Sequence, residues 1–506
     1  MGKLAITGGE PSRKKRFDPW PMYTESERHA LEDVLVNHNW GGQPFPGKHA
    51  DAFGKKFAEF HTAKYGQCVN TGTVAIQVAL KAIDIRPGDE VIVPAYTWEG
   101  TVGPVLLVNA VPVFVDIDPE TYCLDAKLIE QAITPRTRAI LPVHLGMRFA
   151  DLDVIMPLAA KHKLKVIEDC AHAHGGMWRD KGAGSIGDLG AFSFQSSKLI
   201  TAGEGGAVIT NNLEYIERVQ SYINAGRASV TDKFHHRIIG FNYRLGEFQA
   251  AVLGAQLERL PEQAQVRQTN MAYFESRLRN TRGLGLLKPE PRITRLAPYG
   301  YVLKYFAEQV KEIPRAAFVA ALQLEGIPCD GLFYEPVYRS SLFPLNPGDF
   351  PALSWGRPAP LDLRKMYKCP VSEHAVNTAG HVTDRRRRWV ACQRLEDYGV
   401  TDLTCLDSLL GFHIRRIVAA HMAHLHPHSR FRGDVEHLIG FLNRQRKRLL
   451  TEDVLARLSA HPHCGSMEFS WGHDDDGLYV RAFDQRFDVA VEVFDFKLAR
   501  DLFSAL

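Results

Sequence analysis

Residues 164–174 read Leu-Lys-Val-Ile-Glu-Asp-Cys-Ala-His-Ala-His, a short apolar run followed by two acidic residues and a pair of histidines. We expect a buried strand over residues 164–167, because short runs with β-branched residues are typical of strands. Asp169 then lies at the carboxyl end of that strand. A carboxylate in such a position needs a cationic partner or a capping role, because burying an unpaired charge is costly.

Similar short runs flank this segment on both sides. We predict strands over residues 90–94, 111–115, 139–143, 191–194 and 206–209, and helices over residues 74–83, 124–133 and 154–162. Short strands that alternate with helices indicate βαβ units and a mostly parallel sheet covered on both faces. The sequence therefore predicts an α/β fold, with the chemistry at the carboxyl ends of the strands.

The remaining segments predict other arrangements of helices and strands. A helix is expected over Thr24–Asn37, where Thr24 and Glu27 can form a capping box. Residues 211–270 look mainly helical, and the apolar period of residues 248–260 predicts a helix that ends at Pro261. Near the end of the chain, residues 466–493 alternate as two hairpins with a turn at residues 474–477.

We therefore divide the chain into four parts by residue number. They are an N-terminal arm (1–50), a large domain (51–265), a small α+β domain (266–380) and an atypical extension of unknown role (381–506). The extension is interpreted either as an appended α+β domain or as an atypical sequence that only fills space. Its closely spaced histidines, which favour a polar surface over a metal site, are His421, His424, His426 and His428.

Composition excludes several classes of protein. The chain has 506 residues, 45% hydrophobic and 24% charged, with a net charge of +3, as in a soluble protein of more than one domain. This charge gives no argument for nucleic acid, and we interpret Arg385–Arg388 as a solvated surface. No apolar run is long enough for a membrane span, and no signal peptide is seen. Eight cysteines without paired spacing favour a reduced, cytoplasmic protein.

The strongest chemical signal is Ser193-Phe-Gln-Ser-Ser-Lys198, followed by Gly203-Glu-Gly-Gly206. A lysine just after a strand can form an imine with an aldehyde cofactor if its surroundings keep the amine neutral. The hydroxyls of Ser193, Ser196 and Ser197 can donate to a phosphate group. Taken alone, however, a lysine beside serines is usually a surface residue.

Asp169 admits two interpretations. It can pair with a protonated pyridine nitrogen, which keeps such a ring an electron sink, or it can cap a helix N-terminus. The neighbouring His172 and His174 suggest a metal only weakly, so no metal site is predicted.

Two further motifs follow predicted strands or precede predicted helices. The turn Asn70-Thr-Gly-Thr73 presents backbone N–H groups and a hydroxyl at a helix start, where an anion can bind, although simple capping by Thr71 or Thr73 is the plainer reading. Pro94-Ala-Tyr-Thr-Trp98 places Trp98 where it can stack on a planar ring or serve as an ordinary core aromatic.

Taken together, these motifs resemble the sugar aminotransferases of the DegT/StrS type, within the fold-type I pyridoxal-phosphate (PLP) enzymes. The resemblance spans about residues 15–375 and includes Glu168-Asp-Cys-Ala-His172, Phe192-Ser-Phe194 with Lys198, and Gly240-Phe-Asn-Tyr-Arg244. It implies a fold-type I PLP transferase with a smaller α+β C-terminal domain. The match ends near residue 375, before the extension, and Gly146 is displaced from the position usual in the family.

The resemblance also implies roles for individual residues. Lys198 would carry PLP as a Schiff base and shuttle the proton, and Asp169 would pair with the pyridinium nitrogen. Trp98 and His172 would cover the two sides of the ring. The phosphate would be bound by Gly72, Thr73 and Ser193, and by Asn242 of a second subunit, so a homodimer with shared active sites is implied.

The subclass resembles the L-glutamine:scyllo-inosose aminotransferases and, less closely, the 3-amino-5-hydroxybenzoate synthases. This implies L-glutamine or L-glutamate as donor and a keto-cyclitol as acceptor. Glu99 follows Trp98, and its carboxylate can bind the hydroxyls of a polyol acceptor or take part in a salt bridge elsewhere. Nucleotide-linked keto-sugars remain an alternative acceptor class. Sugar dehydratases of the same fold have histidine in place of the lysine, so Lys198 argues against them, and a non-catalytic binding or regulatory protein is the third possibility.

Overall fold

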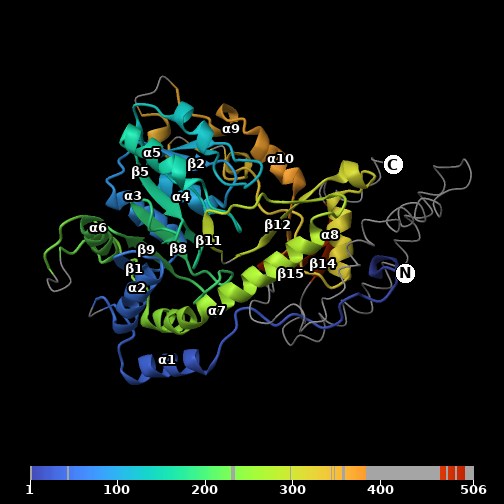
Figure 1. Cartoon of the computed structure of the whole chain (residues 1–506), viewed down its shortest axis with the longest axis horizontal. Coiled ribbons are helices and arrows are strands. Elements are labelled where there is room, and N and C mark those ends of the chain that lie inside the picture. The colour runs from blue at the N-terminus through green and yellow to red at the C-terminus, as the bar shows by residue number, and fades with distance from the viewer. Residues whose placement is uncertain are drawn as a thin grey trace, which may run out of the picture. The chain divides into compact units, whose positions relative to one another are not determined.

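The computed structural model describes residues 3–42, 45–228, 234–296, 298–343, 345–346, 348–355, 359–382, 468–473, 477–484 and 487–495. Its centre is a seven-stranded sheet with the order β1-β9-β8-β5-β4-β2-β3 (Figure 1). Six strands run parallel and β9 runs antiparallel to both of its neighbours. The strands are β1 (Tyr65–Val69), β2 (Glu90–Pro94), β3 (Val111–Val115), β4 (Thr137–Ile140), β5 (Lys165–Asp169), β8 (Leu189–Ser193) and β9 (Gly206–Thr210).

This sheet confirms the predicted α/β class. The strands β2 and β3 have the predicted bounds, whereas β4, β5, β8 and β9 differ from prediction by one to three residues at their ends. The sequence analysis did not predict β1. This strand lies at the edge of the sheet and contains Gly66 and Gln67, so it lacks the apolar run that marks the buried strands.

Most of the predicted helices are present. Helix α1 (Glu25–Val36) begins at the predicted capping box, in which the Thr24 N–H donates to Glu27 Oε2 over 2.8 Å. Helices α3 (Gly72–Ala82) and α5 (Leu152–His162) are also confirmed. Other helices around the sheet are α2 (Lys48–Phe60), α4 (Glu99–Leu107) and α6 (Leu213–Ile223).

The helix expected over residues 124–133 was a wrong prediction. The segment forms two short 3₁₀ turns, η2 (Ala126–Leu128) and η3 (Glu130–Ala132). Leu124 forms a β-bridge with Ile117 instead of entering a helix, and the Asp125 side chain accepts a hydrogen bond from the Lys127 N–H. A bridge and a local cap thus satisfy backbone groups that a helix would otherwise use.

The predicted end of a helix at Pro261 was also wrong. Helix α7 (Glu247–Leu278) continues through Pro261 and runs from beside α2 toward β12 (Figure 1). Pro261 itself is exposed, while Leu257, Leu260 and Ala264 are buried on the opposite face. Packing of this apolar face outweighs the hydrogen bond that proline removes.

The sheet has a hydrophobic core on each face. Along β8 and β9, Ala191 and Val208 belong to one core, and their neighbours Phe192 and Ala207 belong to the other. Helix α3 packs in the first core, and α2 packs in the second through Phe53 and Phe57. Because both faces of the sheet are covered, we expect a ligand to bind at the edge where the parallel strands end.

Two smaller sheets draw most of their strands from the second half of the chain. One is antiparallel and comprises β10 (Leu284–Leu286), β12 (Tyr301–Tyr305) and β13 (Ala379–Val382). A second comprises β11 (Ile293–Arg295), β6 (Met177–Trp178) and β7 (Lys181–Gly182). Helices α8 (Arg315–Leu324), α9 (Leu363–Met366) and α10 (Pro370–Thr378) complete this half of the chain, while the predicted boundaries at residues 50, 265 and 380 stay predictions.

A separate compact unit covers Ala419–Leu506. It contains β14 (Glu468–His473), β15 (Gly477–Asp484) and β16 (Phe487–Asp495), which pair antiparallel in sequence and confirm the two predicted hairpins. The Arg385–Arg388 cluster and the four closely spaced histidines lie outside the described residues. Within the described ranges, every helix is too short or too polar to cross a membrane.

Candidate active site

Asp169 lies at the carboxyl end of β5 and is buried. Thr101 donates its hydroxyl to Asp169 Oδ2 over 2.8 Å, and the Ala171 N–H donates to Oδ1 over 3.1 Å. Burial raises the pKa of Asp169, although the charge of Lys198 and both hydrogen bonds act in the opposite direction. Residues 170–176 form turns rather than a helix, so the helix-cap interpretation of Asp169 is wrong.

Lys198 follows β8 in a turn that its N–H closes by donating to the Gln195 carbonyl over 2.8 Å. The side chain is half-buried, so Lys198 is not the ordinary surface residue that its neighbouring serines would suggest. Its ammonium is near enough to lower the pKa of Asp169, and it lies 4.7 Å from the ring centre of Tyr299. The lysine and the buried carboxylate therefore belong to one site.

The turn before α3 approaches the end of β8 very closely. A Cβ at Gly72 would lie 2.5 Å from the Cβ of Ser193 and 2.9 Å from its Oγ, so only glycine fits there. Thr71 caps α3 by accepting from the Val74 N–H over 3.1 Å, which confirms the plainer capping interpretation for Thr71. This cap leaves the first N–H groups of α3 beside the Ser193 hydroxyl, in an arrangement suited to an anion.

Trp98 immediately precedes α4 and is 61% exposed, so its interpretation as a core aromatic is wrong. A Cβ at Gly100 would lie 3.1 Å from Trp98 Nε1 and 3.4 Å from Thr73 Oγ1. Trp98 and Thr73 therefore both lie close to Gly100. The Trp98 ring is also 6.2 Å from that of Tyr334, which brings the tryptophan to the same region as Asp169.

His172 is buried and lies in an aromatic stack. Its ring is 3.9 Å from that of Tyr299, with 9° between the planes, and the Tyr334 hydroxyl is 3.4 Å from its Nε2. The Gly146 N–H donates to His172 Nδ1 over 3.3 Å, and Gly146 has a φ of 62°, which favours glycine. The displaced glycine in the sequence thus serves to orient His172.

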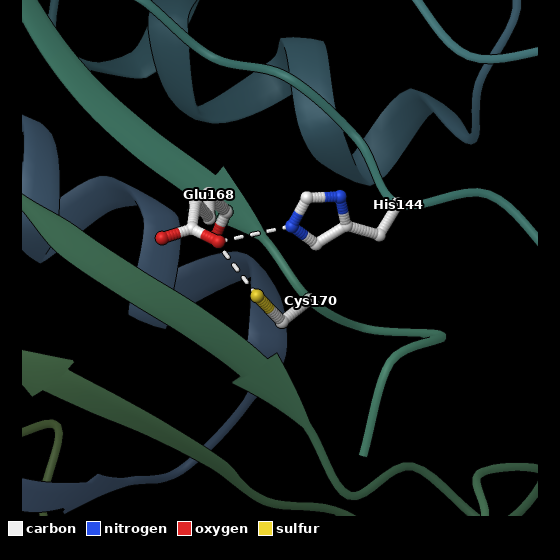
Figure 2. Close-up of side chains that lie close together, drawn as sticks. All are labelled: His144, Glu168 and Cys170. Carbon is white, nitrogen blue, oxygen red and sulfur yellow. Dashed lines mark hydrogen bonds and ion pairs between the residues drawn. The ribbon is translucent and has the colours of Figure 1, made fainter. Parts of the chain in front are cut away.

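One group of potential metal ligands occurs within the described residues, formed by His144, Glu168 and Cys170 (Figure 2). His144 Nε2 lies 3.0 Å from Glu168, while its Nδ1 accepts from the Ala150 N–H over 3.2 Å. Both carboxylate oxygens of Glu168 also accept from backbone N–H groups, at Gly184, Ile186 and Gly187. These internal bonds occupy the ligand atoms of His144 and Glu168, so we interpret the group as a brace that holds the end of β5.

Asn242 is the exception among the predicted site residues. It is exposed, and its backbone forms a β-bridge with Asn224. Within the described part of the chain, no hydrogen bond joins Asn242 to Asp169, His172, Ser193 or Lys198.

Three residues of the site were missed in the sequence. Thr101 holds Asp169, and Tyr299 and Tyr334 stack beside His172. Tyr334 immediately precedes Glu335–Arg339, a segment outside the motifs from which the site was predicted. Tyr299 carries no local signal, because its contacts come from segments more than 100 residues away.

The chemistry of this group fits PLP. Asp169 is a buried carboxylate whose pKa is raised by burial, and a protonated pyridine beside it would stabilise its charged form. Lys198 offers an amine at the same site, and the Gly72–Ser193 approach offers a cradle for the phosphate. The three groups match the ring nitrogen, the aldehyde and the phosphate of this cofactor.

Comparison with known proteins gives the same result. A curated protein of Micromonospora echinospora, named L-glutamine:2-deoxy-scyllo-inosose aminotransferase, is 37% identical over 397 residues, covering 74% of this chain and 91% of that protein. A protein of Streptoalloteichus tenebrarius, provisionally named L-glutamine:3-amino-2,3-dideoxy-scyllo-inosose aminotransferase, is 40% identical over 379 residues, covering 74% and 90%.

A solved structure of 3-amino-5-hydroxybenzoic acid synthase superposes with a TM-score of 0.66 and 30% identity, covering 78% of this chain and 97% of that one. The profile of the DegT/DnrJ/EryC1/StrS aminotransferase family matches residues 21–352, which contain Lys198, Asp169 and all the other predicted site residues. The chain therefore belongs to the DegT/DnrJ/EryC1/StrS aminotransferase family and is a PLP-dependent aminotransferase.

Proposed function

We propose that this enzyme transfers the amino group of L-glutamine or L-glutamate to a keto-cyclitol of the scyllo-inosose type, in the biosynthesis of aminocyclitols or related compounds. The names of relatives that are 35–40% identical support this substrate class. The single observation that carries the chemistry is the placement of Lys198 beside buried Asp169, with the Gly72–Ser193 cradle at the same edge of the sheet.

When bound, PLP supplies an electron sink that stabilises negative charge on the substrate carbon. Asp169 is proposed to keep the ring nitrogen protonated, because a buried carboxylate is stabilised by a cation next to it. Thr101 and the Ala171 N–H fix the direction of this carboxylate. Both groups are proposed to orient Asp169, while other residues contact the substrate.

Lys198 would hold the cofactor through Nζ, and the same amine would take the proton from the substrate carbon. A general base must lie within hydrogen-bonding reach of that proton. The turn at Gln195–Lys198 and the Tyr299 ring confine the lysine side chain to this region. His172 is the third residue of the proposed catalytic group, because its ring is held at the same place by Gly146.

The remaining residues are proposed to bind the cofactor. Gly72, Thr73 and Ser193 take the phosphate at the start of α3, and Trp98 covers one face of the ring while His172 lies on the other side. The exposed position of Trp98, on the same side of the site as Thr73, supports its role as a cover.

We further propose a homodimer in which Asn242 reaches the phosphate of the second subunit. Exposed apolar side chains near Asn242 support an interface, since Phe234 is 91% exposed, Ile239 is 89% exposed and Phe241 is 53% exposed.

We also propose that the enzyme is cytoplasmic. Support comes from five described cysteines that are free and buried, namely Cys68, Cys123, Cys170, Cys329 and Cys369.

The test is a panel of acceptors assayed with L-glutamine, L-glutamate and L-alanine as donors. We expect turnover with scyllo-inosose-type ketones and L-glutamine or L-glutamate, and none with Lys198→Ala, which also loses the visible absorbance of lysine-bound PLP. Preference for nucleotide-linked keto-sugars would overturn the acceptor assignment. Turnover by Lys198→Ala would overturn the assignment of the lysine.

A further inference from the structure

His174 lies in the turn after β5 and is fully buried. Its Nε2 is 2.8 Å from the backbone carbonyl of Ser193. Because a carbonyl only accepts hydrogen bonds, the imidazole proton is on Nε2 and His174 is the donor. The other ring nitrogen, Nδ1, is buried and has no hydrogen-bond partner in the described structure, so this one donated bond anchors the ring.

The surroundings of His174 keep it neutral. Its ring centre lies 6.4 Å from that of Phe57, 5.6 Å from that of Phe192 and 5.7 Å from that of Phe194. Burial among these rings, reinforced by the charge of nearby Lys198, lowers the pKa of His174 to about 3. His174 is therefore a fixed neutral donor beside the lysine at the pH of most assays.

Ser193, which accepts this bond, is the last residue of β8 and is pressed against Gly72 at the start of α3. On one side its carbonyl is held by His174, and on the other side its hydroxyl faces the N-terminus of α3. His174 is also only two residues from His172 and five from Asp169. It thus links the turn that carries His172, directly after Asp169 and β5, to the strand end that forms one wall of the cradle.

We propose that His174 is a positioning residue that holds Ser193 against the N-terminus of α3 and thereby sets the affinity of the enzyme for the phosphate group of its cofactor. This inference rests on the proposed function, in which Ser193 binds that phosphate.

His61 provides a matched control. It is also fully buried, next to Phe57 and Phe192, and burial lowers its pKa to about 3. Its hydrogen bonds go to the Ala183 carbonyl at 2.9 Å and from the N–H of Gly175, the residue after His174, at 3.1 Å, and neither includes Ser193. Replacing His61 thus disturbs the same core without touching the bond to Ser193.

The experiment measures the dissociation constants of PLP and of pyridoxal, which lacks the phosphate, by titrating the visible absorbance of the full-length protein. We expect His174→Phe to weaken PLP binding about tenfold or more while leaving pyridoxal binding unchanged. His174→Gln, whose amide can reach the Ser193 carbonyl, should restore PLP affinity, and the shorter His174→Asn should not. His61→Phe should lower thermal stability and leave the ratio of the two constants unchanged.

In a Ser193→Ala background, His174→Phe should have a smaller effect on the ratio, because the residue that it positions has lost its hydroxyl. Equal losses for PLP and pyridoxal in His174→Phe and His174→Asn would overturn the inference and leave His174 a packing residue. An unchanged ratio in Ser193→Ala alone would instead overturn the proposed phosphate role of Ser193. If His174→Phe does not fold, His174→Asn compared with His174→Gln decides the question.

Discussion

At the scale of single residues, the buried carboxylate of Asp169 lowers the stability of the folded protein until a cation binds beside it. Burial raises its pKa despite the nearby charge of Lys198 and two hydrogen bonds. A carboxyl group whose folded pKa lies above its unfolded pKa loses its proton first in the unfolded chain. The free energy of unfolding therefore falls as pH rises from the unfolded pKa through the folded one.

We predict that Asp169→Asn raises the melting temperature of the PLP-free protein at neutral pH by a few degrees, because the substitution removes a poorly compensated buried charge. Addition of PLP should stabilise the variant less than the native protein, since the pyridinium loses its partner. Thermal unfolding of both proteins, with and without PLP, provides the measurement. A variant that is less stable without PLP and gains as much from it would contradict the assigned role of Asp169.

Glu99 supports a second prediction at this scale. It is the first residue of α4, follows exposed Trp98, and its charge contributes to raising the pKa of Tyr334. Within the described residues no salt bridge includes Glu99, so the plain alternative of a salt bridge elsewhere finds no support there. A carboxylate at this position can accept hydrogen bonds from the hydroxyls of a polyol.

Glu99→Gln is expected to raise the KM for the keto-cyclitol about tenfold, because a charged acceptor is replaced by a weaker one. The half-reaction with L-glutamine should be unchanged, and Glu99→Asp should retain part of the native affinity. Steady-state kinetics with each substrate varied separately will show the difference. An effect of equal size on both half-reactions would contradict the proposed contact between Glu99 and the acceptor.

At the scale of elements, the sequence predicted most of the strands and helices because their apolar periods are local. The predictions from the sequence were wrong where tertiary packing outweighed a local sequence pattern. Pro261 is a strong helix terminator in sequence, but α7 continues because its buried face spans both sides of the proline. The edge strand β1 was missed for the related reason that its partner β9, rather than its own composition, makes it a strand.

We predict that Pro261→Ala stabilises the protein by about 1–3 kcal/mol, because the helix gains a backbone hydrogen bond and position 261 is exposed. Glu262→Ala, at the next exposed position, is the control and should change little. Chemical unfolding of the two variants and the native protein measures the difference. A destabilised Pro261→Ala would show that the packing of α7 requires the geometry that proline imposes.

At the scale of the whole molecule, the core between α2 and the sheet contains two buried neutral histidines, His61 and His174. Both have an ordinary pKa of 6.5 when unfolded and a pKa lowered to about 3 in the fold. Below pH 6.5 these two histidines are protonated in the unfolded chain, whereas they stay neutral in the folded protein. Stability is therefore complete above about pH 6.5 and is lost progressively as pH falls toward 3.

We expect the free energy of unfolding to drop by about 1.4 kcal/mol per pH unit for each of these histidines between pH 6 and pH 4. His61→Phe should show a shallower dependence on pH, because one of the two sites is gone. Urea unfolding at a series of pH values gives both slopes. Identical slopes would mean that His61 is not held neutral in the fold.

The extension yields a prediction at the same scale. All the residues assigned to the site precede residue 335, and the family profile ends at residue 352. A chain that ends after Val382, and so keeps β13, should bind PLP and turn over with unchanged kcat. Comparison of its absorbance and kinetics with those of the full chain is the measurement. Loss of PLP binding in a folded truncated chain would show that the extension supports the site.

The sequence by itself determined most strands of the sheet and singled out Lys198, Asp169 and Gly72, because strand patterns and turn residues are short-range properties read within a few residues. Only the tertiary structure decided which side chains surround them. Thr101 reaches Asp169 across 68 residues of sequence, and Tyr334 reaches His172 across 162. Such contacts depend on how β2, β5 and the later segments pack together, and no local pattern encodes that distance in space.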